Sequence, residues 1–149
     1  FINGSNNGNS YNFKYTWIFL FSLALQSPYI WAENDVVGFE ILMKTSSSWD
    51  GSPLPYYPSG APQLTILKVV IPPGKVVAMH KHPMINAGVL LSGELTVISD
   101  DGSKLRLSAG EAIVEVVDTW HFGRNDGVDP AVMLVFYAGV EGQQMSIKK

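Results

Sequence analysis

Short apolar runs, many of them β-branched or aromatic, recur from residue 37 onward and are separated by Gly, Pro, Asp and Ser. No long stretch combines apolar residues at helical spacing with helix caps, so the pattern predicts strands rather than helices. The expected strands cover residues 37–44, 64–71, 75–82, 88–91, 94–99, 104–107, 112–117 and 131–138. Many short strands of this kind indicate an antiparallel sandwich or barrel, which can enclose a ligand cavity.

Turn signals and one long loop separate the expected strands. Asp100-Asp101-Gly102 predicts a hairpin turn, because Gly readily adopts a positive φ. Residues 45–62 form a loop rich in Pro, Gly and Ser that carries Trp49, Tyr56 and Tyr57. Long loops in small domains are often functional, so these aromatic side chains either cover the barrel or contact a ligand.

The composition limits the classes of function. The length of 149 residues suits one domain, and 46% apolar with only 15% charged residues favours a folded core. The net charge of −3 and the absence of a Lys or Arg block argue against a nucleic-acid partner. Because the chain has no cysteine, disulfides, thiolate nucleophiles and Cys-type zinc sites are excluded.

The first part of the chain has the pattern of a secretion signal. Residues 1–12 are rich in Asn, Gly and Ser, and Lys14 precedes an apolar run, 15–25, typical of a signal-peptide core. No Asp or Glu precedes Glu33, and cleavage is expected near Ala32-Glu33. Residues 1–32 would then be a signal peptide with a flexible lead-in. The mature domain, 33–149, would be secreted or periplasmic without a stable membrane anchor; a buried first strand or a membrane anchor is the alternative.

The three histidines of the chain suggest a metal site. His80 and His82 flank Lys81, and alternate side chains of a strand share a face, so both imidazoles should point the same way. His121 follows a later strand-like run. Neutral imidazole is a common ligand of transition ions, whereas the alternative is a set of hydrogen-bonded histidines in a metal-free pocket.

The spacing around these histidines follows a known pattern. Gly74 is followed by five residues, His80-Lys81-His82, three residues, Asn86, six residues and Gly93. Gly110 is followed by ten residues, His121, three residues and Asn125. These segments resemble the two signature motifs of the cupin superfamily, G-x5-H-x-H-x3,4-E-x6-G and G-x5-P-x-G-x2-H-x3-N. The resemblance covers residues 64–138, the core of one small cupin domain.

This resemblance implies a fold and a chemistry. It implies an all-β double-stranded β-helix, the jelly-roll barrel, that holds a divalent transition metal (Fe, Mn, Ni or Zn) on His80, His82 and His121. It also implies a homodimer and a small-molecule ligand or substrate, with dioxygenase- or isomerase-like chemistry. The alternative is a non-catalytic cupin that binds a metal or a metabolite.

The chain departs from the family motifs at three positions. Asn86 replaces the usual Glu ligand, and Val116 and Asp118 replace the Pro and Gly of the second motif. Asp tolerates unusual φ values better than most residues, so its position affects mainly the turn. Asn86 is either a weak fourth metal ligand or a residue that hydrogen-bonds the turn of residues 86–88.

Glu115 lies in an otherwise apolar run, 111–117, where a buried carboxylate is costly unless it is paired. Strand alternation groups it with Ile113 and Val117. We therefore consider Glu115 a candidate catalytic residue that points inward and supplies the carboxylate missing at position 86. It would act as a ligand, as a hydrogen-bond partner of a histidine, or as a general base. The alternative is an outward Glu on a solvated strand face.

Overall fold

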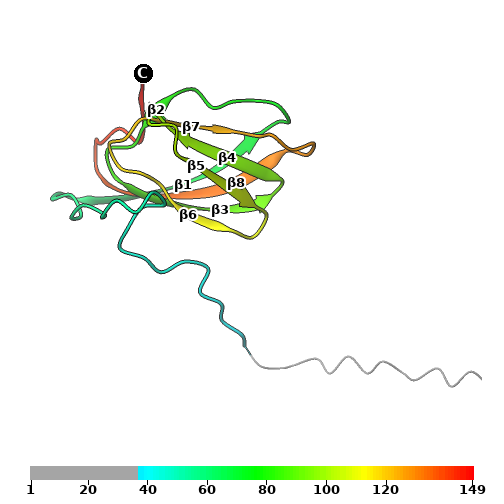
Figure 1. The fold of residues 1–149 in the computed structure, drawn as a ribbon. Helices are drawn as coiled ribbons and strands as arrows, with labels where there is room; N and C mark the ends of the chain where they lie inside the picture. The colour runs from blue at the N-terminus through cyan, green and yellow to red at the C-terminus, as the bar shows by residue number, and fades with distance from the viewer. Residues whose placement is uncertain (1–36) are drawn as a thin grey trace, which may run out of the picture. The chain divides into compact units, whose positions relative to one another are not determined.

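The computed structural model describes residues 37–149, in which nine strands form two sheets of antiparallel strands (Figure 1). The first sheet has the order β1 (Pro62–Ile71), β8 (Ala131–Val140), β3 (Ile85–Ser92) and β6 (Ala112–Val114). The second has the order β5 (Lys104–Ser108), β4 (Glu94–Ser99), β7 (His121–Arg124), β2 (His80–Lys81) and β9 (Ile147–Lys148). Strands from opposite ends of the domain are thus neighbours, which confirms the predicted all-β jelly-roll fold.

Residues outside this range carry part of the sequence prediction. The expected signal peptide, residues 1–32, and its cleavage site at Ala32-Glu33 lie outside the described residues. Gly38–Lys149 form one compact unit. Residues 37–149 include no helix long and apolar enough to cross a membrane.

The core lies between the two sheets and follows from the alternation of side chains along each strand. On β8, Met133, Val135 and Tyr137 are buried, and the residues between them are more exposed. Leu95 and Val97 of β4 join them in the same apolar cluster from the opposite sheet. Removing these apolar surfaces from water is the main stabilising contribution to such a domain.

The structure confirms the expected strands at 64–71, 88–91, 94–99, 104–107 and 131–138, with bounds that differ by a few residues. It also confirms the hairpin turn after β4. Gly102 has a φ of 86°, and its N–H donates to the carbonyl of Ser99 at 2.9 Å. The turn between β3 and β4 depends on Gly93, whose φ is 76° and where a Cβ would lie 2.6 Å from the Pro130 carbonyl oxygen.

The strand expected at 37–44 is wrong. These residues pair with no strand in the described part of the chain, and Phe39 is 94% exposed. Apolar alternation alone does not make a strand, because a strand also needs a neighbour that accepts its hydrogen bonds.

Two further strands are shorter than expected, and two were not predicted. Only His80–Lys81 of 75–82 and Ala112–Val114 of 112–117 lie in strands, because the chain leaves the ladder on either side. Strands β7 and β9 were missed because His121–Arg124 and Ile147–Lys148 are too short and too polar to give a periodic signal.

The long loop 45–62 packs on the jelly roll at one point. The Trp49 N–H donates to the Val114 carbonyl at 2.9 Å, and the Ser48 hydroxyl donates to the Glu115 carbonyl at 2.9 Å. The Trp49 side chain packs against the core, whereas Tyr56 and Tyr57 are 100% and 76% exposed. Trp49 therefore covers the jelly roll, and the two tyrosines neither cover it nor approach the core.

Candidate metal centre

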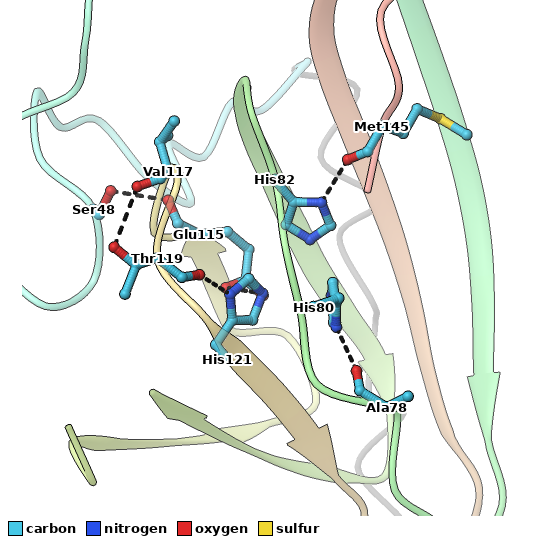
Figure 2. A network of polar contacts seen from close by, with 9 residues as sticks. All are labelled: Ser48, Ala78, His80, His82, Glu115, Val117, Thr119, His121 and Met145. Atoms are coloured by element: carbon cyan, nitrogen blue, oxygen red, sulfur yellow. Dashed lines mark hydrogen bonds and ion pairs between the residues drawn. The ribbon is translucent and has the colours of Figure 1, made fainter. Parts of the chain in front are cut away.

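The pairing of two short strands brings the three histidines together (Figure 2). His80 of β2 lies directly opposite His121 of β7, and His82 forms a parallel bridge with Val117 just before β7. The ring centroids of His80 are 4.5 Å from those of His121 and 4.8 Å from those of His82. One nitrogen of each ring lies within 4.8 Å of the others, so the predicted convergence of the three imidazoles is confirmed.

The second nitrogen of each ring is held by a backbone carbonyl. The Nδ1 atoms of His80, His82 and His121 lie 2.7, 2.7 and 2.9 Å from the carbonyl oxygens of Ala78, Met145 and Thr119. A carbonyl only accepts hydrogen bonds, so each Nδ1 must carry the proton and donate it. The lone pair therefore lies on Nε2 in all three rings, which is the tautomer that a metal requires.

Burial keeps these imidazoles neutral. It lowers the pKa of His82 to about 4, although the hydrogen bond to Met145 opposes this shift. Burial also lowers the pKa of His80 and of His121, against their hydrogen bonds to Ala78 and Thr119. Unprotonated rings near neutral pH need no proton release before they bind a cation.

Glu115 lies just after β6 and points into the same cavity. Its side chain is buried, and Oε2 lies 3.6 Å from Nε2 of His121. Burial raises the pKa of Glu115 to about 7, although the charge of His80 and the Trp49 indole act in the opposite direction. The outward orientation considered from the sequence is not observed, because the chain leaves the β6 ladder after Val114 and residues 113–116 are all buried.

Asn86 also lines this cavity, from strand β3. It is 1% exposed, and neither its amide nitrogen nor its amide oxygen has a hydrogen-bond partner. The expected turn at 86–88 is wrong, because these residues lie within β3, paired with β8 on one side and with β6 for part of their length on the other. Asn86 therefore does not hydrogen-bond a turn, and its amide remains available inside the cavity.

The sequence analysis missed two contributors to the site. Tyr137 of β8 lies opposite Asn86, and its ring centroid is 5.3 Å from that of His82. Burial and the charge of Glu115 raise the pKa of Tyr137 to about 12, so its phenol stays protonated and able to donate. Inward alternation along 131–138 would have indicated Tyr137, but the Met145 carbonyl comes from a segment with no motif.

These groups surround one cavity of about 340 Å³ between the sheets. Small-molecule sites commonly range from about 300 to 1,000 Å³, so the cavity suits a small ligand. Polar residues line one part of it, and apolar residues line the rest: Val69, Ile71, Val77, Ala78, His80, His82, Asn86, Leu95, Val97, Glu115, His121, Gly123, Met133, Val135, Tyr137, Ser146 and Lys148.

Orphaned polar atoms test whether these residues fit a metal ion. His121 Nε2 and Glu115 Oε2 are buried without a hydrogen-bond partner, although nearly all buried polar groups in proteins have one. A lone pair on each atom would repel the other at 3.6 Å unless a proton or a cation lies close by. Three imidazole nitrogens with carboxylate and amide oxygens nearby match the ligands of divalent transition ions. The residues therefore fit such an ion.

Comparison with protein families decides the assignment of this fold and site. The family model described as a cupin domain matches residues 67–137, which contain all three histidines. The chain belongs to the cupin superfamily. The positive φ of 54° at Asp118 accounts for one departure from the family motif, because Asp replaces the usual Gly at this turn.

Solved structures agree with the cupin fold. A double-stranded β-helix protein from Klebsiella pneumoniae matches with a TM-score of 0.51 and 22% identity over 62% of this chain and 90% of its own. The DMSP lyase DddQ from Ruegeria pomeroyi has a TM-score of 0.51 and 21% identity over 66% of this cupin and 47% of the lyase. An oxalate oxidase has a TM-score of 0.47 and 27% identity over 51% and 42%. No curated protein gives a significant match.

Proposed function

We propose that this cupin acts on a small molecule through a divalent metal held by His80, His82 and His121, with dioxygenase- or isomerase-like chemistry. One observation carries the proposal. Three Nε2 lone pairs, each fixed by a carbonyl on Nδ1, converge beside the buried carboxylate of Glu115 in a cavity that suits a small ligand. When bound, a divalent transition ion would supply Lewis acidity and a template for ligand oxygen atoms.

Glu115 is the group that would move a proton in this proposal. A carboxyl with a pKa of about 7 is close to the value at which a general base works best near neutral pH. In its ionised form, Oε2 would accept a proton from an O–H or acidic C–H group of the substrate. Tyr137 would donate a hydrogen bond to the substrate, since its phenol remains protonated.

The proposed role also includes a location. We propose that the protein is secreted or periplasmic, on the strength of the signal-like pattern in residues 1–32. N-terminal sequencing of the protein exported by its host tests this, and a start near Glu33 is expected.

A homodimer is proposed from the outer face of the first sheet. Leu64, Ile66 and Val70 of β1 are 79%, 61% and 54% exposed, and Phe136 of β8, opposite Ile66, is 44% exposed. Contiguous exposed apolar surface of this kind commonly marks a protein interface. A second copy would cover this face and leave the metal centre inside each subunit.

The function is tested by metal retention followed by turnover. We expect purified protein to retain a transition ion and His82→Ala to lose it. Oxygen uptake or isomerisation in a screen of small diketones, phenols and hydroxy acids should disappear in Glu115→Gln. A protein that retains the ion and is stabilised by a ligand, yet turns nothing over, would be the non-catalytic binding cupin. Protein that never retains an ion would contradict the proposal.

A further inference from the structure

The cavity has two chemically different regions. The histidines, Glu115, Asn86 and Tyr137 form its polar region, which contains the proposed metal centre. The remaining wall consists mainly of aliphatic side chains from both sheets and from the segment before β2: Val69, Ile71, Val77, Leu95, Val97, Met133 and Val135.

Strand geometry places these regions one after the other. Along β8, the inward residues follow the order Tyr137, Val135, Met133, and successive inward residues are separated by about 7 Å. Along β7, Gly123 follows His121 on the same face. Val69 of β1 lies opposite Met133. The apolar region therefore extends the cavity away from the histidines for at least one further pair of strand residues.

Charges in the cavity restrict the head of a ligand. Among the lining residues that the structure describes, Glu115 is the one carboxylate, and Lys148 is the one Lys or Arg. Lys148 is exposed, so it lies at the rim rather than in the interior. No buried cation is present here to neutralise a second negative charge, and an unpaired buried charge is costly.

Building on the proposed function, we infer that the ligand is a small oxygen chelator with a neutral or singly negative head and an apolar body. The head would occupy the polar region at the metal, and the aliphatic or aromatic body would lie between Val97 of one sheet and Val135 of the other. Small dianions without an apolar body would leave this wall uncovered and would lack a partner for their second charge.

Gly123 leaves part of the apolar region free. A Cβ at this position would contact Leu95 Cδ1 at 3.4 Å and Val77 Cγ2 at 3.9 Å, which is ordinary van der Waals contact. Gly123→Ala is therefore compatible with the fold while it shortens the space beyond His121. It provides a variant that changes the cavity without touching the metal ligands.

A homologous series of alkyl hydroxamates on zinc-loaded, full-length protein tests the inference by calorimetric titration. All members share one metal-chelating head and differ only in apolar length. We expect Kd to fall by about fourfold per added methylene, the effect of full burial, until the cavity is full. Oxalate, a dianion with no apolar body, should bind more weakly than the longer hydroxamates.

Two variants separate the apolar wall from the metal head. Gly123→Ala should leave acetohydroxamate affinity unchanged and shift the best chain length to a shorter member. Val135→Thr, which is close in shape, should reduce the gain per methylene. A Kd independent of chain length in the parent protein would overturn the inferred ligand class while leaving the metal site intact. Zinc-loaded protein that binds no hydroxamate would overturn both this inference and the proposed open metal centre.

Discussion

The face-to-face placement of Glu115 Oε2 and His121 Nε2, 3.6 Å apart and both buried, is the chemical centre of the site at the scale of single residues. Hydrogen bonds from Nδ1 fix which imidazole nitrogen carries the lone pair, and burial keeps the rings neutral. The same burial raises the pKa of the carboxyl to about 7. One environment thus prepares the histidines as ligands and Glu115 as a proton acceptor.

Replacing Glu115 by Gln should change the pH dependence of stability in metal-free protein. The folded pKa of about 7 lies above the ordinary 4.5, so the contribution of Glu115 is fully present below pH 4.5 and is lost as the pH rises through 7. Chemical denaturation should therefore show Glu115→Gln gaining on the parent, by on the order of 3 kcal/mol between pH 4.5 and 8. A constant difference across this range would contradict a buried, titrating Glu115.

Replacing Asn86 by Asp tests whether this amide faces the metal. Without metal, the new buried carboxylate should lower the free energy of unfolding by about 1–3 kcal/mol, because the side chain has no hydrogen-bond partner. With metal, the added negative charge should enlarge the metal-induced rise in Tm. Thermal unfolding with and without zinc measures both changes, and equal metal-induced rises in parent and variant would place Asn86 away from the ion.

At the scale of strands, the site depends on two elements that are too short to be seen in the sequence. Strand β7 sets His121 opposite His80, and β9 pairs with β2 on its other side. The segment leading into β9 supplies the Met145 carbonyl that holds His82. Gln143 attaches this segment further, since its Nε2 donates to the Pro83 carbonyl at 3.0 Å. The last strand is therefore part of the metal centre.

Disrupting β9 should weaken metal binding without unfolding the domain. The Lys149 N–H donates to the Met79 carbonyl, and alternation points the Ile147 N–H toward β2 as well. Ile147→Pro removes this donor, so we expect Kd for zinc to rise by about 10- to 100-fold as the partner of His82 is displaced. Competition with a chelating dye measures Kd. Ile147→Val is the matched control, and an unchanged Kd in Ile147→Pro would show that β9 does not support the site.

At the scale of the whole molecule, the two sheets have different surroundings. Their inner faces form the core and the cavity, whereas the outer face of the first sheet exposes Leu64, Ile66 and Val70. The jelly roll thus separates chemistry inside the domain from association outside it. This separation allows assembly to be tested without altering the site.

A charge on the outer face should prevent dimer formation. Ile66→Glu places an unpaired carboxylate in the middle of the proposed interface, so we expect a shift from dimer to monomer in sedimentation equilibrium. Val128→Glu is the matched control, because Val128 is 89% exposed in a loop away from this sheet. If Ile66→Glu and the parent have the same mass, the outer face is not the interface.

The motif spacing was sufficient to predict the jelly roll and the three histidines, because ligand residues and turn glycines occupy fixed places relative to the strands. It could not show that Asn86 lies inside a strand, since that depends on pairing with β8 and β6. Nor could it show the Met145 carbonyl or Tyr137 beside His82, because both arise from contacts between segments distant in sequence. The apolar run at 37–44 misled the analysis because periodicity says nothing about whether a partner strand exists.

X-ray absorption at the zinc edge of zinc-loaded protein tests the central claim most directly. The account predicts scattering from three imidazole rings at about 2.0–2.1 Å, with oxygen atoms completing the shell. His121→Ala should reduce the count to two imidazoles. A spectrum of the parent protein with fewer than three imidazoles, or with oxygen ligands alone, would contradict the convergence of His80, His82 and His121 on one ion.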